Sequence, residues 1–152
     1  MEADDEVSIQ QTADPNEATV IASNDKDLRC TPGKLYNPRT DTLEVISEEA
    51  ALEHLIYQLV VGDTVDNIPG LPRKGPKWYE KHIEGEPLPR QLANLHDAYY
   101  AHDKSMEYFV EQLNLLHMLQ TDDPKPGKYT VDDFVYRCHE VLGRRKASDS
   151  FY

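Results

Sequence analysis

Three groups of acidic side chains in the first half of the sequence are spaced closely enough to share a cation. The groups are Glu2, Asp4 and Asp5; Asp25 and Asp27; and Asp63 and Asp66. Carboxylate oxygens are the ligands that hard cations such as Mg²⁺ and Mn²⁺ prefer, and like charges held together repel unless a cation neutralises them. Taken singly, each group is more simply explained as solvated surface acid. Their order ahead of a basic turn favours a shared cation site.

That basic turn directly follows the last acidic group. Residues 62–77 read GDTVDNIPGLPRKGPK, so the aspartates give way to a stretch rich in proline, glycine and cations. The chain as a whole has a formal net charge of −12, which opposes broad adhesion to DNA or to anionic lipid. Any contact with DNA must therefore be local, and we expect it at this turn. The simpler alternative is an ordinary basic turn on an acidic protein.

The elements that would position the first two acidic groups are short. Residues 2–13 predict a helical or irregular stretch that ends at residues 14–16, and the apolar run TVIAS at residues 19–23 predicts a buried strand. A parallel strand of this kind delivers its following loop to the edge where ligand sites of α/β proteins gather. Residues 34–45 predict a hairpin with its turn at residues 37–41. The N-terminal half is thus expected to contain both helix and strand.

The rest of the chain predicts helices. Ser47 is placed to cap a helix over residues 48–60, whose apolar side chains recur with helical spacing at Leu52, Leu55, Ile56, Leu59 and Val60. Further helices are predicted at residues 77–83, 88–102, 105–119 and 131–142, the last with a capping arrangement of Thr130 and Asp133. A ragged tail is expected from Gly143 onward.

Composition narrows the class of protein. A length of 152 residues allows one compact unit with a modest core. Cys30 and Cys138 lack metal-type spacing, and no apolar leader follows Met1, so we expect a reducing cytoplasm. No apolar run approaches a membrane span, and none of the six histidines has a zinc-like spacing. We therefore expect neither a membrane partner nor a histidine ligand.

The three acidic signatures, in their order, resemble those of the structure-specific 5′-nucleases. The segments EADD at residues 2–5, ASNDKDL at residues 22–28 and the turn sequence at residues 62–77 carry the likeness, which extends to about residue 83. The family includes flap endonucleases, the 5′-nuclease domain of bacterial DNA polymerase I and phage 5′-3′ exonucleases, and the phage type is the closer match. The resemblance implies a role in DNA replication, in the host cytoplasm if the gene belongs to a phage.

The resemblance also implies a fold and its boundaries. It implies an α/β chain in which residues 1–60 form the C-terminal part of a PIN-like or Rossmann-like nuclease core. Residues 61–142 would form a helix-hairpin-helix with a helical region, and residues 143–152 a flexible tail. The central sheet of the family begins upstream of EADD, so the first strands, further metal-binding aspartates and a helical arch are expected on a separate N-terminal-half polypeptide. Such a partner would cover the open edge of the strand at residues 19–23.

Site roles follow from the same resemblance. It implies two Mg²⁺ or Mn²⁺ ions held by Glu2, Asp4, Asp5, Asp25, Asp27, Asp63 and Asp66, with Asp25, Asp27, Asp63 and Asp66 catalytic. Paired ions of this kind activate a water and stabilise both oxygens of an in-line displacement at phosphorus. The DNA-binding set, for a duplex with a 5′ end or flap, would be Asn67, Gly70, Arg73, Lys74, Gly75, Lys77 and Lys81.

Two departures from the family pattern matter. Arg73-Lys74-Gly75 stands where the usual hairpin has Gly-x-Gly, which leaves binding of K⁺ at this turn open. The missing upstream segment leaves open a second class of function, a helix-hairpin-helix module that binds DNA without cutting it. Retention of all three acidic groups favours the nuclease, because a pure binding module has no reason to hold repelling carboxylates near a polyanion.

Overall fold

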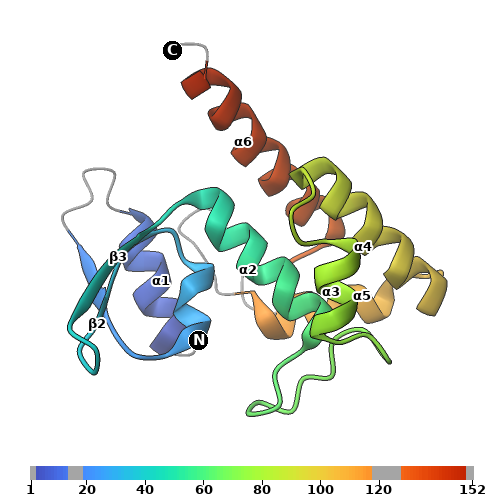
Figure 1. Cartoon of the computed structure of the whole chain (residues 1–152), viewed down its shortest axis with the longest axis horizontal. Coiled ribbons are helices and arrows are strands. Elements are labelled where there is room, and N and C mark those ends of the chain that lie inside the picture. Colours follow the sequence, from blue (N-terminus) through green and yellow to red (C-terminus); the bar gives the residue numbers. More distant parts are fainter. Residues whose placement is uncertain (1–2, 14–18, 118–127, 150–152) are drawn as a thin grey trace.

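The computed structural model describes residues 3–13, 19–117 and 128–149, which form a mixed α/β fold (Figure 1). Its helices are α1 (Ala3–Ala13), α2 (Glu48–Val61), α3 (Pro76–His82), α4 (Leu88–His102), α5 (Glu107–Leu116) and α6 (Val131–Asp149), with a 3-10 helix, η1 (Lys26–Cys30). Figure 1 shows α2 in the middle of the molecule, with the sheet and α1 to one side and α3, α4 and α5 to the other.

The described sheet has three strands, in the order β1 (Val20–Ala22), β2 (Gly33–Asn37) and β3 (Thr42–Ile46). Strands β1 and β2 are parallel, whereas β2 and β3 form an antiparallel hairpin in which Asn37 is opposite Thr42. The parallel strand and the hairpin are both confirmed. The predicted burial of β1 is only partly correct: Ile21 is buried, but Val20 is 48% exposed, because successive side chains of a strand lie on opposite faces of the sheet.

One face of the sheet packs on the protein and the other is open. Paired residues share a face, and residues along a strand alternate between faces. Ile21, Leu35 and Ile46 are buried on the inner face, where they form a small core with Leu28 and Ala51. The outer face exposes apolar side chains from both edge strands, namely Val20, Leu43 and Val45.

The larger core lies among the helices. It contains the fully buried side chains Ile56, Leu59 and Val60 of α2, together with Leu113 of α5. The predicted apolar stripe of α2 is confirmed, and so is its cap, because the Ser47 Oγ accepts the Ala50 N–H at 3.0 Å. Helix α2 thus carries buried side chains of both cores, Ala51 in the smaller one and the stripe in the larger one.

The remaining predicted helices also form. Thr130 and Asp133 cap α6 reciprocally: Asp133 Oδ2 accepts the Thr130 N–H at 2.8 Å, and Thr130 Oγ1 accepts the Asp133 N–H at 3.2 Å. Helix α6 continues to Asp149, whereas the sequence predicted its end near Leu142. The chain break predicted at residues 14–16 and the last residues of the tail lie outside the described residues. None of the helices in the described ranges is long and apolar enough to cross a membrane.

Candidate metal centre and basic hairpin

Three of the predicted carboxylates come together from two distant segments. Asp27, in η1, and Asp63 and Asp66, which follow α2, each offer an oxygen within 4.8 Å of those of the other two. Asp63 is 3% exposed, Asp27 is half-buried and Asp66 is exposed. Burial therefore decreases from Asp63 through Asp27 to Asp66. The group extends from the protein interior to the surface, where a cation in solution could reach it.

A tight turn places Asp63 and Asp66. Asp63 and Ile68 form an isolated antiparallel bridge, with N···O distances of 2.8 and 2.7 Å. The Asp63 Oδ1 accepts the Val65 N–H at 3.0 Å, which holds the carboxylate inside the turn. Gly62 ends α2 with φ 75°, in the left-handed region that favours glycine. The turn thus returns the chain over the end of α2 with both aspartates on it.

Asp27 is positioned by its own helix and by α2. The Asp25 side chain caps η1 by accepting the Asp27 N–H at 2.9 Å. The Gln58 Nε2 donates to Asp27 Oδ1 at 2.7 Å, and the Cys30 thiol donates to Gln58 Oε1 at 3.1 Å. Gln58 was not predicted from the sequence, because a glutamine within an apolar helix gives no signal of what it will face.

Asp4 of α1 also belongs to this electrostatic neighbourhood. Burial raises the pKa of the Asp4 carboxyl, and the charges of Asp25, Asp5 and Asp66 raise the same pKa further. Two of those charges come from the other acidic groups, so the three groups converge electrostatically. Asp5 is half-buried and Asp25 is exposed, while Glu2 lies outside the described residues.

The donor set fits a hard divalent cation. All of its ligand atoms are carboxylate oxygens, and oxygens on opposite sides of a Mg²⁺ ion lie about 4 Å apart, twice the Mg–O distance. The spread of up to 4.8 Å among Asp27, Asp63 and Asp66 is close to that value. These three residues could hold one ion. The charge of Asp66 also acts on Asp4, together with the charges of Asp25 and Asp5.

The predicted DNA-binding cations are all at the surface. Arg73, Lys74, Lys77 and Lys81 are exposed, on the hairpin that continues from Asp66 and on the α3 helix that follows it. The Lys74 Nζ lies 5.7 Å from the centre of the Trp78 ring, and Trp78 packs against the larger core. Gly75 precedes α3 as its N-cap residue, and nothing would contact a Cβ there. Cations and carboxylates therefore occupy one continuous segment.

Gly70, which was predicted to contact DNA, is buried and makes hydrogen bonds inside the protein. Its N–H donates to Gln112 Oε1 at 2.9 Å and its carbonyl accepts from the Tyr108 hydroxyl at 2.6 Å. A Cβ at this position would lie 2.5 Å from the Gly62 nitrogen. The Gly70 N–H is thus already bonded inside the protein, and the glycine serves close backbone packing. Asn67 is exposed and has a left-handed backbone, with φ 57°.

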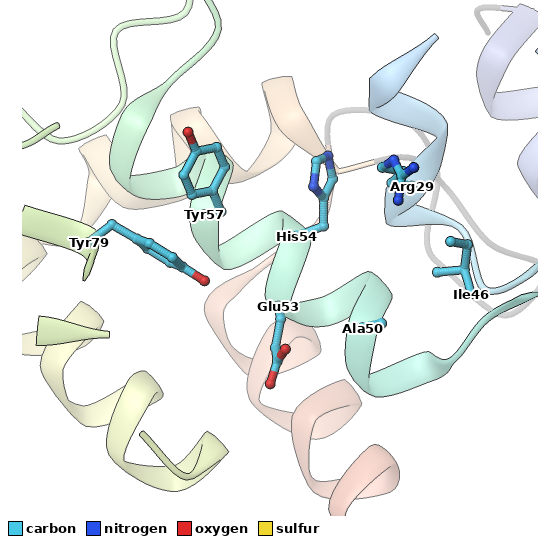
Figure 2. A pocket seen from close by; sticks show the side chains of 7 residues that line it. All are labelled: Arg29, Ile46, Ala50, Glu53, His54, Tyr57 and Tyr79. Atoms are coloured by element: carbon cyan, nitrogen blue, oxygen red, sulfur yellow. The ribbon is translucent and has the colours of Figure 1, made fainter. Parts of the chain in front are cut away.

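A separate open pocket of about 290 Å³ lies between the end of the sheet, α2 and α3 (Figure 2). It is lined by Arg29, Ile46, Ala50, Glu53, His54, Tyr57 and Tyr79. The rings of Tyr57 and Tyr79 meet edge to face at 4.9 Å, and burial together with the charge of Glu53 raises the pKa of Tyr79. None of the grouped carboxylates lines this pocket, so it is distinct from the candidate metal centre.

Comparison with known proteins identifies no family for this chain. No protein-family model, no curated protein and no solved structure matches the chain. What the chain does must therefore be inferred from the convergent carboxylates and the basic hairpin beside them.

Proposed function

We propose that this chain carries the metal-binding and DNA-binding residues of a divalent-metal-dependent 5′-nuclease, of the exonuclease or flap-endonuclease type. One observation carries the proposal: Asp27, Asp63 and Asp66 meet within 4.8 Å although their segments are far apart in sequence. Carboxylates held this close repel one another, and a bound divalent cation would offset that repulsion. The fold proposed for this function is the C-terminal part of a PIN-like nuclease core followed by a helix-hairpin-helix.

Within this proposal, the chain's residues hold ions and orient a phosphodiester. Mg²⁺ or Mn²⁺ ions, when bound, would supply an activated water and stabilise the oxygens of an in-line displacement at phosphorus. Asp27 and Asp63 are held by internal hydrogen bonds and would fix the position of the cation. Asp66 is exposed and would face the side from which DNA approaches.

The basic hairpin supports DNA as the substrate. The side chains of Arg73, Lys77 and Lys81 are exposed and sit in the same segment as Asp63 and Asp66. Cations of this kind bind phosphates, which positions a duplex without reading its sequence. Because the chain as a whole is strongly acidic, the exposed cations of this segment would offset its repulsion of a polyanion locally.

The open edge of β1 supports the proposed partner. In the described sheet β1 is an edge strand that pairs only with β2. An unpaired strand edge is a template for addition of a further strand. We therefore include in the proposal an N-terminal-half polypeptide that adds to this edge and completes the nuclease in the cytoplasm. Strong cleavage by the solitary chain would refute the need for that partner.

The deciding experiment replaces Asp63 and Asp66 by asparagine together. The proposal expects the wild-type chain to bind Mn²⁺ and a 5′-flap duplex, and the double variant to lose Mn²⁺ binding and any Mg²⁺-dependent cleavage while it retains the duplex. Asp97→Asn with Asp132→Asn changes the net charge equally at exposed positions of α4 and α6, and is the matched control. Binding is measured by calorimetry and gel shift, cleavage on a 5′-labelled flap.

The second candidate, a DNA-binding module without catalysis, is favoured by the exposure of the hairpin cations alone. It predicts that the wild-type chain binds the duplex but not Mn²⁺, with no cleavage after addition of any divalent cation. Equal loss of metal and duplex binding in the double variant would instead assign the two aspartates a structural role. The three outcomes separate the candidates without assuming that the partner is present.

A further inference from the structure

A buried glutamine links the two segments that supply the carboxylates. Gln58 is 4% exposed in α2, and its side-chain Nε2 donates to Asp27 Oδ1 at 2.7 Å. Its backbone carbonyl accepts the Gly62 N–H at 2.7 Å, at the end of α2 directly before Asp63. One residue therefore bonds Asp27 through its side chain and, through its backbone, the residue directly before Asp63.

The direction of the glutamine amide is set by its partners. Burial, and secondarily the charge of Asp27, raises the pKa of the Cys30 thiol, so that thiol stays protonated and acts as a donor. The Gln58 Oε1 must then accept from Cys30 at 3.1 Å, which turns the amide N–H group toward Asp27. An ionised carboxylate only accepts hydrogen bonds. The donor and the acceptor are therefore fixed in both hydrogen bonds, from Cys30 to Gln58 and from Gln58 to Asp27.

These hydrogen bonds connect η1, which contributes to the small core under the sheet, with α2 and the larger helical core. Cys30 is buried in the larger, helical core, whereas Leu28 of the same 3-10 helix belongs to the smaller core of the sheet. Asp27 lies in the first turn of the same 3-10 helix and is only half-buried.

We propose that Gln58, oriented by Cys30, is a positioning residue that holds the Asp27 carboxylate in place for a divalent cation shared with Asp63 and Asp66. The inference rests on the proposed metal-binding function and adds a residue to it. Gln58 acts through Asp27 and does not itself contact the ion. Hydrogen bonds from outside the ligand set commonly determine the orientation of metal-binding carboxylates, and their loss typically lowers metal affinity about 10–100-fold.

The test measures the affinity of the full chain for Mn²⁺ alone, by calorimetry and by the electron paramagnetic resonance of the bound ion. Gln58→Leu should weaken Mn²⁺ binding by about tenfold or more and change the resonance of what remains bound. Gln91→Leu is the matched control, because Gln91 is also a buried glutamine, at 3% exposure, but its amide bonds to Glu86 and Glu53. It should leave both readouts unchanged.

A second pair of variants covers the case in which Gln58→Leu fails to fold. Cys30→Ala removes the donor that orients the amide and should weaken Mn²⁺ binding severalfold. Cys30→Ser restores a donor and should recover most of the affinity. Recovery by serine would not be expected if Cys30 acted only as a space-filling side chain.

The outcomes separate this inference from the function on which it rests. If the wild-type chain binds no Mn²⁺, the proposed function is overturned, and this inference with it. If the wild-type chain binds Mn²⁺ but Gln58→Leu binds it equally well, only the inference is overturned. If Gln58→Leu and Gln91→Leu lose Mn²⁺ affinity equally, and in proportion to the fall in their urea midpoints, Gln58 has only a structural role and the inference is likewise overturned.

Discussion

Two aspartates, one at the candidate centre and one among the C-terminal helices, have pKa values shifted in opposite directions. Burial, then the charges of Asp25, Asp5 and Asp66, raises the pKa of Asp4. Hydrogen bonds from the Ser105 side chain, and then from the backbone N–H groups of Tyr108 and Ser105, lower the pKa of Asp103. The first carboxylate lies among other negative charges, whereas the second accepts hydrogen bonds. The proposed cation would offset the repulsion at the first, and hydrogen bonds already stabilise the charge of the second.

The same two regions differ in how firmly they are packed. The described core under the sheet consists of Ile21, Leu28, Leu35, Ile46 and Ala51, whereas the core of the helical half draws on α2, α4, α5 and α6. Asp27 belongs to the first region and Asp63 to the second. The candidate centre therefore lies where the two regions meet. We expect Asp27 and Asp63 to be held in place with different firmness.

The largest expected effect is on the helical core. Leu113→Ala removes a side chain of α5 that is 0% exposed, and should lower the free energy of unfolding by about 2–5 kcal/mol because a cavity remains. Leu115→Ala, on the same helix but 55% exposed, is the control and should change it by no more than about 0.5 kcal/mol. Urea unfolding measures both, and similar losses would contradict the assignment of the core.

A smaller and more local effect is expected under the sheet. Leu35→Ala should reduce the opening free energy of amides in β1, β2 and η1 by about 2 kcal/mol, since it empties part of a small core. Amides of α4 and α5 should keep their protection, because their side chains pack in the other core. Native-state hydrogen exchange reports both regions in one experiment. Uniform loss of protection would show that the two regions unfold as one unit.

The smallest effects distinguish the two aspartates by pH. Asp4 has a raised pKa in the folded protein, so stability linked to its protonation is present below about pH 3.8, its ordinary value, and is lost as pH rises. Asp4→Asn should therefore raise the urea midpoint of the metal-free protein at pH 7 and have little effect at pH 3.

Asp103 has the opposite sign. Its pKa is lowered, so its stabilising effect is present above about pH 3.8 and is lost as pH falls through the folded value. Asp103→Asn should lower the urea midpoint at pH 7 and matter less in acid. Shifts of the same sign for Asp4→Asn and Asp103→Asn at pH 7 would remove the contrast between the regions.

Local rules account for the parts of the fold that the sequence predicted. Ser47 and the Thr130–Asp133 pair cap helices through contacts within a few residues, and the apolar stripe of α2 is set by helical spacing. The extent of α6 was missed because Gly143 usually weakens a helix, here without ending it. The exposure of Val20 depends on which face of the sheet the rest of the protein covers, and no local pattern encodes that.

The candidate centre was predictable in kind but not in detail. Residue type and order indicated carboxylates for a cation, yet only the folded chain shows that Asp27 joins Asp63 and Asp66. The contacts that hold them in place depend on long-range packing of neutral amides: Gln58 lies 31 residues from Asp27, and Gln112 lies 42 from Gly70. Neutral amides carry no charge pattern or period that marks their partner in advance.

The exposed apolar face of the sheet and the negative charge of the chain together affect solubility. Leu43 and Val45 are 60% and 68% exposed there, next to strands whose edges can pair. At neutral pH the charge of −12 makes two copies repel each other before those faces can touch. Near the isoelectric point of about 4.8 that repulsion vanishes while the apolar faces remain, so mild acid should make the protein precipitate.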